Sequence, residues 1–333
     1  MSGLRPGVPL AEVTRCVRGC VADPVESLHT GHLVVTDADG TVRAGLGDRH
    51  VPVFVRSAVK PLQAAACLEL LADAGATRPS PPELAVASAS HCGAPRHLDA
   101  VRALLERAGV DPEQLTCPPA TATADPGAAP TRLQHNCSGK HAMFALAGGM
   151  LGLSGPALLD ADGPLQRRVL ATLDTDLGGL TGVGVDGCGA PAVVAPLSGL
   201  ATAFARFVGE PRFEPVRDAV LAHPGLVGCE GRLESALLGA GVVAKPGAEG
   251  VYGVAWRDSA GEPHGLAVKA SDGSGRGVAA ALSTLLEDIE VVAPGIWSAP
   301  PPLGGGDPVG EVRASAAVRD LGQQAALRAV APG

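Results

Sequence analysis

The β-branched runs of this sequence come in pairs separated by short polar turns, and this pairing limits the folds that the chain can adopt. Residues 32–36 run into the turn dipeptide Asp39-Gly40, and residues 251–256 are followed, after a polar turn, by 264–269. Strands joined this closely pair antiparallel. Helical periodicity, as in residues 61–74, fills stretches between the pairs. The pattern therefore predicts an α+β fold, an antiparallel sheet flanked by helices with a helical subregion, rather than strands and helices alternating around a parallel sheet.

Charge and hydropathy exclude several classes of partner. The chain has 333 residues, a net charge of −8 and no basic run that would suit a nucleic acid. It has no apolar run as long as the core of a signal peptide or the roughly 20 residues of a membrane span. We therefore expect a cytoplasmic protein with no nucleic-acid or membrane partner, in which the eight cysteines are reduced.

Lysine is scarce in this chain. Of 26 basic Lys and Arg residues, only four are lysines: Lys60, Lys140, Lys245 and Lys269. Arginine keeps its proton near neutral pH, whereas a buried lysine can lose it. The four lysines are therefore candidates for amines that must at some stage be uncharged, although the neighbours of Lys245 suggest no chemical role for it.

Ser57 and Lys60 form a Ser-x-x-Lys motif. Residues three apart on a helical turn share one face, and a neutral lysine can take the proton of a serine hydroxyl to make a nucleophile. The motif is short, but the scarcity of lysine lowers the expected number of chance matches. Pro61 is expected at the first position of the following helix, with Lys60 at its cap. The alternative is a capping serine beside a solvated lysine.

Cys137 and Lys140 lie at the predicted start of another helix. A helix N-terminus lowers the pKa of a thiol, so Cys137 could be a nucleophile with His135 or His141 as its base. It could also be a metal ligand together with Cys188, because soft thiolates favour zinc; a further ligand would come from Lys140, a histidine or water. Buried, unreactive thiols are the third possibility.

Three further positions carry candidate chemistry. Ser90 and His91 are adjacent polar residues that follow a helix, and the Asp186 carboxylate could bind a substrate amine. Lys269 ends an apolar strand. In Ser-x-x-Lys acyl-transferases, a lysine on a strand lies beside the serine nucleophile. The Lys-Thr-Gly signature of those enzymes is absent here.

Six segments spread over residues 25–273 form a pattern that is specific when taken together. In chain order they are Arg56-Ser57-Ala58-Val59-Lys60-Pro61, Ser90-His91 with His97, Asn136-Cys137-Ser138-Gly139-Lys140-His141, Asp186-Gly187-Cys188, His223-Pro224 with Glu230-Gly231-Arg232, and Val268-Lys269 with Asp272-Gly273. This pattern resembles the asparaginase II family, the zinc-containing, rhizobial type of L-asparaginase.

The resemblance implies a fold like that of the serine β-lactamases, a homodimer, and a single catalytic domain over residues 1–333. The tail of that domain, 298–333, contains a run of three prolines and a run of three glycines before a last helical stretch expected at 323–330. The implied reaction is hydrolysis of L-asparagine to L-aspartate and ammonia.

The resemblance also implies the members of the site. Two Ser–Lys tandems would act there, Ser57 with Lys60 and Ser90 with Lys269, and we expect Ser57 to attack the amide and form an acyl-enzyme. A Zn²⁺ ion would be bound by Cys137, Lys140 and Cys188. Contacts with the substrate are expected from Arg56, His91, Asn136 and Asp186.

The sequence departs from the family pattern at two cysteines. Cys92 follows Ser90-His91, and Cys229 stands where glycine is common. Neither change touches the implied chemistry. Two rival functions are a penicillin-recognising serine acyl-enzyme and a non-catalytic, zinc-stabilised protein that binds a small molecule.

Overall fold

The computed structural model describes residues 6–18, 21–324 and 327, and it divides the chain into two compact units. The sheet unit comprises Met1–Val55, Ala195–Gly209 and Ala240–Gly333, and the helical unit comprises Arg56–Val194 and Glu210–Gly239. The prediction of one catalytic domain concerns how the two units act together, and it stays a prediction.

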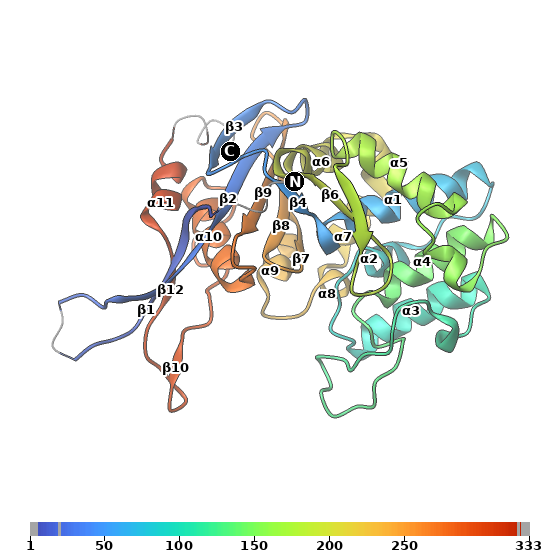
Figure 1. Cartoon of the computed structure of the whole chain (residues 1–333), viewed down its shortest axis with the longest axis horizontal. Coiled ribbons are helices and arrows are strands. Elements are labelled where there is room, and N and C mark those ends of the chain that lie inside the picture. The colour runs from blue at the N-terminus through green and yellow to red at the C-terminus, as the bar shows by residue number, and fades with distance from the viewer. Residues whose placement is uncertain (1–5, 19–20, 325–326, 328–333) are drawn as a thin grey trace. The chain divides into compact units, whose positions relative to one another are not determined.

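A seven-stranded antiparallel sheet forms the sheet unit (Figure 1). Its strands run in the order β12 (Val312–Ala314), β1 (Val8–Thr14), β2 (Val25–Asp37), β9 (Pro263–Ala270), β8 (Val251–Arg257) and β7 (Val243–Gly247), and β3 (Val42–Leu46) pairs with β2 off this path. Both predicted strand pairs are confirmed, because β2 pairs antiparallel with β3 and β8 with β9. Gly40, in the turn between β2 and β3, has a φ of 90°, which favours glycine.

Helices cover both faces of this sheet. α6 (Leu197–Gly209) lies on the face that carries Thr36, since the Thr202 hydroxyl is 3.2 Å from the Thr36 hydroxyl. Gly265 shares that face, and a Cβ there would meet the Ala201 carbonyl oxygen at 1.9 Å, so only glycine allows this close approach. α10 (Gly275–Asp288) packs against His29 on the opposite face, because alternate strand residues point to opposite sides.

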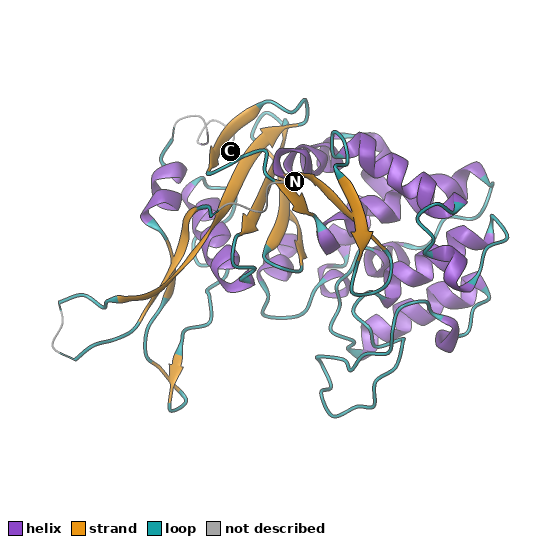
Figure 2. Cartoon of the chain, viewed as in Figure 1, coloured by secondary structure: helices purple, strands orange, loops and turns teal. Residues whose placement is uncertain are grey.

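The remaining elements of the sheet unit are short. They are β4 (Pro52–Phe54), the hairpin of β10 (Leu303–Gly304) and β11 (Asp307–Pro308), and α11 (Ala316–Gly322), which packs on α10. The helical stretch expected at 323–330 falls largely on 325–326 and 328–330, which lie outside the described residues. The predicted α+β class is confirmed by the antiparallel sheet and the helices around it (Figure 2).

Helices dominate the helical unit (Figure 2). They are α1 (Lys60–Asp73), α2 (Pro81–Ala87), α3 (Pro95–Ala108), α4 (Ser138–Gly149), α5 (Pro164–Asp176), α7 (Glu214–Ala222), α8 (Pro224–Val227) and α9 (Leu233–Gly239), with the short 3-10 helices η1 (Arg56–Val59), η2 (Pro112–Gln114), η3 (Gly155–Leu158) and η4 (Pro211–Phe213). A hairpin of β5 (Gly182–Val185) and β6 (Pro191–Pro196) follows α5. Proline begins several of these helices, and α3 ends at the predicted Gly109, whose φ is 66°.

α4 is the central helix of the helical unit. Its residues from Ser138 to Gly148 are all buried, and it packs against α1, α2 and α3. A helix that is buried all round holds its first turn in place, and the chemistry-bearing residues Cys137 and Lys140 belong to that turn. In the part of the chain that the structure describes, no helix is long and apolar enough to cross a membrane.

Candidate active site

The Ser-x-x-Lys motif lies on the turn that leads into α1. Arg56 to Val59 form η1, Val59 caps α1, and Lys60 and Pro61 are the first two residues of the helix. The predicted cap position is therefore off by one residue. Arg56 has a φ of 48°, in the left-handed region that side chains rarely adopt, so the turn that presents Ser57 is held in a strained conformation.

The Lys60 side chain is buried and reaches two later segments of the chain. Its Nζ donates to the carbonyl oxygens of Ala89 at 2.6 Å and Asn136 at 3.4 Å, and lies 3.1 Å from Ser90 Oγ. Among the described residues, no side-chain hydrogen bond joins Lys60 to Ser57. The structure thus brings Lys60, Ser90 and Asn136 together, and it places Ser57 on the entry turn of α1.

These three contacts determine what the amine can do. A charged ammonium group can donate to all three oxygen atoms. A neutral amine keeps two N–H donors, which suffice for the two carbonyl groups, and turns its lone pair toward Ser90, whose hydroxyl hydrogen it accepts. The geometry is therefore suited to the exchange of a proton between Lys60 and Ser90.

His91 holds the segment that carries Ser90. The Gly93 N–H donates to His91 Nδ1 at 3.1 Å, so the ring proton lies on Nε2, which donates to Ser138 Oγ at 2.9 Å. The ring stacks on that of His97, with 5.2 Å between the centroids. Burial lowers the pKa of His91 from 6.5 to about 3, so the ring is neutral near pH 7. Both nitrogen atoms of this predicted substrate contact are engaged within the chain.

Cys137, Lys140 and Cys188 form a buried thiol–amine cluster. Cys137 caps α4, Lys140 lies in its first turn, and Cys188 lies between β5 and β6. Lys140 Nζ is 3.1 Å from Cys188 Sγ, and the two thiols lie close enough for each to shift the pKa of the other. The three side chains assigned to one metal site by resemblance therefore converge, although Cys188 is 48 residues from Lys140.

The protonation states of the thiol–amine cluster depend on one another. The hydrogen bond with Cys188 is the largest of the causes that hold the pKa of Cys137 well below 9.0, and the same bond raises the pKa of Cys188. Burial acts to lower the pKa of Lys140, but the charges of the two sulfur atoms outweigh it, and that pKa is raised. In the protein alone, these interactions favour the thiolate form of Cys137 and the ammonium form of Lys140.

The donor set of the thiol–amine cluster suits a soft divalent metal. Among the described residues, no group of three or more His, Cys, Asp or Glu side chains is placed so that it could hold a metal ion. This cluster instead offers two sulfur atoms and one amine, which are donors of the kind zinc prefers, and three ligands leave one tetrahedral position open. The cluster fits zinc if Cys188 and Lys140 release their protons on binding.

An ion pair joins Arg56 to the turn that carries Cys188. Arg56 donates through Nε at 2.9 Å and Nη2 at 2.8 Å to Asp186 Oδ1, which also accepts the Gly187 N–H at 2.8 Å. Two of the predicted substrate contacts are thus bound to each other. A ligand with one carboxylate and one ammonium group offers each of them a new partner of the correct sign.

Asn136 links Lys60 with the thiol–amine cluster. Its carbonyl oxygen accepts from Lys60, and its Oδ1 lies 3.3 Å from Cys137 Sγ. The sequence pattern predicts Asn136 as a substrate contact but gives no sign of the role of its backbone. The role of Ala89 is equally hidden, because a carbonyl oxygen has no signature in a sequence; only the position of Ala89 before Ser90 could have indicated it.

Lys269 lies on β9 in the sheet unit. Its Nζ donates to the carbonyl oxygens of Glu249 at 2.6 Å and Ala270 at 2.5 Å. Burial lowers the pKa of Lys269, which makes the uncharged amine more accessible than in an exposed lysine. Ser90 belongs to the helical unit, so the Ser90–Lys269 tandem stays a prediction.

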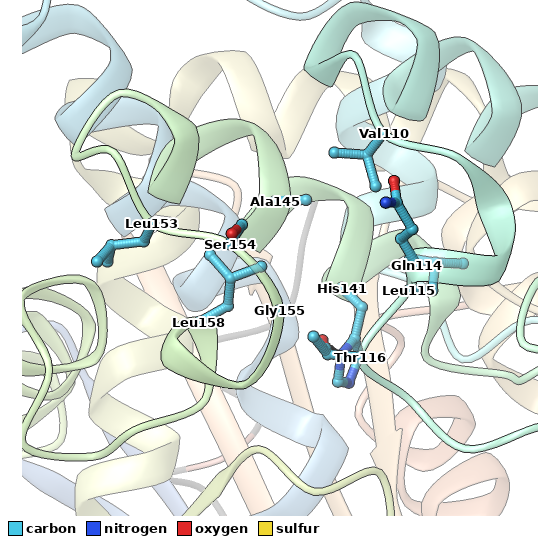
Figure 3. Close-up of a pocket in the computed structure, with 10 residues that line it drawn as sticks. All are labelled: Val110, Gln114, Leu115, Thr116, His141, Ala145, Leu153, Ser154, Gly155 and Leu158. Atoms are coloured by element: carbon cyan, nitrogen blue, oxygen red, sulfur yellow. Dashed lines mark hydrogen bonds between the residues drawn. The ribbon is translucent and has the colours of Figure 1, made fainter.

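A cavity of about 360 Å³ lies beside α4 (Figure 3). Its walls are mainly apolar, and His141 and Thr116 line it side by side, with 2.6 Å between His141 Nδ1 and Thr116 Oγ1. His141 Nε2 is buried and has no hydrogen-bond partner in the part of the chain that the structure describes. The predicted catalytic residues are not among the described residues that line this cavity.

Several solved structures are similar to the chain. One is Mglu in its native form in the presence of 4.3 M NaCl, with 16% sequence identity and a TM-score of 0.42 over 78% of this chain and 60% of the Mglu chain. The chain therefore spans less than two thirds of that relative. Another is a variant of the class A β-lactamase of the last common ancestor of Gram-negative bacteria, with 19% identity and a TM-score of 0.37 over 74% of this chain and 85% of that chain.

Comparison with protein families gives a more specific assignment than comparison with solved structures. No curated protein sequence matches the chain significantly. The family model for L-asparaginase II matches residues 15–314, which is nearly the whole chain. The chain therefore belongs to the L-asparaginase II family, as the resemblance predicted.

Proposed function

We propose that the chain hydrolyses L-asparagine to L-aspartate and ammonia through an acyl-enzyme formed on a serine. The observation that carries the proposal is the 3.1 Å contact between the buried Lys60 amine and Ser90 Oγ. Family membership supports the choice of substrate. The Arg56–Asp186 pair offers charges complementary to the carboxylate and the ammonium group of a free amino acid.

In the proposed mechanism, neutral Lys60 takes the hydroxyl proton of Ser90 while its two N–H groups remain on the carbonyl oxygens of Ala89 and Asn136. Ser90 Oγ bonds to the side-chain amide carbon of the substrate. The C–N bond then breaks, and the leaving nitrogen takes the proton from Lys60 and departs as ammonia. Water attacks the ester and gives a proton to Lys60, which returns it to Ser90 Oγ as aspartate leaves.

This mechanism assigns Lys60 to a different serine from the one that the sequence analysis expected. Because Lys60 contacts Ser90 directly, we propose that Ser90 bears the acyl group. Ser57, on the strained turn beside Arg56, is then a hydroxyl that orients the substrate. His91 positions Ser90 through its bonds to Gly93 and Ser138.

The test compares Ser90→Ala with Ser57→Ala in an ammonia-release assay with L-asparagine, with L-glutamine in parallel. We expect Ser90→Ala to lower kcat on the order of 10³-fold or more, as for other catalytic nucleophiles, and Ser57→Ala to keep measurable turnover. The opposite result would return the nucleophile role to Ser57. Absence of amide turnover by the unmodified chain would overturn the function, and nitrocefin hydrolysis in its place would favour the penicillin-recognising alternative.

We also propose that Cys137, Lys140 and Cys188 hold a Zn²⁺ ion. When bound, zinc would supply a Lewis acid beside the Asn136 segment. Elemental analysis of the purified protein tests this: we expect stoichiometric zinc in the unmodified chain, and loss of most of it in Cys188→Ser. Cys67→Ala, which removes another buried cysteine, is the matched control and should keep its zinc.

The proposed assembly is a homodimer, which rests on the resemblance. Light scattering at several protein concentrations measures the mass in solution. A mass of one chain at every concentration would contradict it.

A further inference from the structure

The helical unit contains a second pair of neighbouring thiols, Cys92 and Cys229, apart from the thiol–amine cluster. Cys92 lies two residues after Ser90, and Cys229 two residues after Val227. The Ser90 N–H donates to the Val227 carbonyl oxygen at 3.1 Å, and Cys92 lies close enough to Cys229 to raise the pKa of its thiol. Two segments that are distant in the sequence are therefore aligned so that their cysteines meet.

The two thiols differ in their access to solvent. Cys92 is partly exposed, whereas Cys229 is only 8% exposed. The backbone is fixed at both positions, because the Ala124 N–H donates to the Cys92 carbonyl oxygen at 2.9 Å and the Ser235 hydroxyl to that of Cys229 at 2.8 Å. A molecule in solution can reach Cys92, and the second thiol already lies behind it.

We propose that Cys92 and Cys229 are a redox-active pair, a modification site that exchanges with low-molecular-weight disulfides and closes to an intramolecular disulfide. Such a bond joins cysteines whose Cα atoms lie about 4.4–6.8 Å apart. Neighbouring thiols on two segments that a backbone hydrogen bond joins need only a small movement to form it. The bond would tie the segment that carries Ser90 to the segment between α8 and α9.

The exchange takes place in two balanced steps. The Cys92 thiolate attacks one sulfur of glutathione disulfide, which forms a mixed disulfide and releases one glutathione thiolate. The Cys229 thiolate then attacks Cys92 Sγ, which forms the protein disulfide and releases the second glutathione thiolate. The two protons lost by the cysteines end on the two glutathione molecules. Two protein thiols are thus oxidised, and one glutathione disulfide is reduced.

The second step becomes easier once the first has taken place. Burial, the hydrogen bond with Cys92 and the charge of Cys92 raise the pKa of Cys229 to about 12. In the mixed disulfide, Cys92 has neither a charge nor a thiol, so burial and the charge of Glu234 are what still oppose ionisation of Cys229. Arg232 lies close enough to favour the thiolate.

The other buried cysteines are not equivalent. Cys137 and Cys188 are only 4% and 2% exposed, and they are in contact with Lys140, so an external disulfide does not reach them. Cys67 is completely buried. Cys16 is exposed, so its oxidation reports whether the reagent has acted.

The experiment treats the native full-length protein with glutathione disulfide, alkylates the remaining thiols, and digests with trypsin without reduction. Trypsin releases Cys229 alone in residues 218–232, and Cys92 together with Cys67 in residues 57–96. We expect mass spectrometry to find most of peptide 218–232 linked to 57–96 at a concentration that oxidises Cys16, and to find the link gone after reduction.

Two variants assign the link. Cys67→Ala, the matched control in the same peptide, should keep it, whereas Cys92→Ser should abolish it and leave Cys229 alkylated. Oxidised Cys16 with peptide 218–232 unlinked would overturn the proposal, as would a link that persists in Cys92→Ser.

Discussion

At the scale of single residues, the surroundings of Lys60 define which side chains can replace it. Its nitrogen atom is buried among the carbonyl oxygens of Ala89 and Asn136 and the hydroxyl of Ser90. An arginine brings five N–H donors in a planar fork and keeps its proton. It therefore has donors without acceptors here, and it cannot take the proton of Ser90.

We expect Lys60→Arg to lower kcat for L-asparagine about 10²–10⁴-fold, the contribution of a general base. Lys269→Arg should also lower kcat. Lys140→Arg should both lower kcat and remove zinc. Steady-state ammonia release measures the effect. Arg43→Lys, on a side chain that is 46% exposed, is the control and should keep the unmodified kcat. A Lys60→Arg enzyme as active as this control would contradict the role of Lys60 as a base.

The pH dependence of stability provides a test of His91. Its folded-state pKa of about 3 lies below the ordinary 6.5, so between these values the unfolded chain binds a proton that folded His91 does not. The protein therefore loses stability through His91 as the pH falls through this window. His91→Gln should cost about 1–3 kcal/mol at pH 7, because buried hydrogen bonds are lost, and the deficit should shrink at pH 5. Urea unfolding at the two pH values measures it, and a deficit that grows toward pH 5 would be the contrary result.

Sequence spacing predicted which residues belong to the site better than it predicted which of them are in contact with each other. Ser57 is the neighbour of Lys60 in the motif, yet the lysine bonds to Ser90, 30 residues away. The residue types had left Lys140, a histidine or water open as the ligand beside Cys137 and Cys188, and only the resemblance selected Lys140, because no local spacing relates residues 48 positions apart. Nothing in the sequence indicated that Cys92 meets Cys229, since such long-range contacts depend on the packing of the whole helical unit.

At the scale of elements, the helices and strands that could be predicted have a regular hydrophobic period and residues that mark where they end. β2 and β3 are joined by Asp39-Gly40, and α3 ends at Gly109, so the antiparallel direction of the strand pair and the ends of β2 and α3 could be read in advance. The start of β2 at Val25, well before the predicted strand at 32–36, could not. The sequence pattern did not predict β1 or β7. β1 contains Pro9, and β7 contains Lys245-Pro246-Gly247, residues that are rare in strands and are accepted here because pairing with neighbouring strands outweighs local preference.

The contact between α6 and β9 gives a prediction at this scale. Gly265→Ala should destabilise the protein by about 1–3 kcal/mol, because the new Cβ collides with the Ala201 carbonyl oxygen and overpacks the interface. Chemical denaturation measures the change. Gly149→Ala is the control, because a Cβ there has no neighbour within 4 Å, and it should be neutral or stabilising by up to about 1 kcal/mol. Equal effects of the two substitutions would show that the close approach is not what requires glycine.

At the scale of the whole molecule, the two units draw on different parts of the chain. The sheet unit needs three stretches that include residues from both ends, whereas every segment of the helical unit precedes residue 240. A fragment of residues 1–239 therefore contains the complete helical unit but lacks β7, β8, β9 and α10. Within the sheet, β2 loses the strand that it pairs with in the full chain.

In that fragment we expect the backbone amides of α4 to remain protected from hydrogen exchange, because the helices packed on it are all present. The amides of β2 that bond to β9 should exchange rapidly, although they are protected in the full chain. Mass spectrometry of exchanged peptides compares the two, with α4 as the internal control. Protection of β2 without β9, or loss of protection in α4, would contradict the division into two units.

The division into two units also determines the order in which their segments are completed during synthesis on the ribosome. Lys60, Ser90, Cys137 and Cys188 have all been translated, with the rest of the helical unit, before β8 and β9 emerge. β2, a strand of 13 residues that becomes largely buried, is among the first segments made and receives its partner β9 among the last. An apolar strand that waits with one edge unpaired is open to pairing with other nascent chains. The yield of folded protein should therefore depend on how quickly the final third of the message is translated and on chaperones that occupy β2 in the meantime.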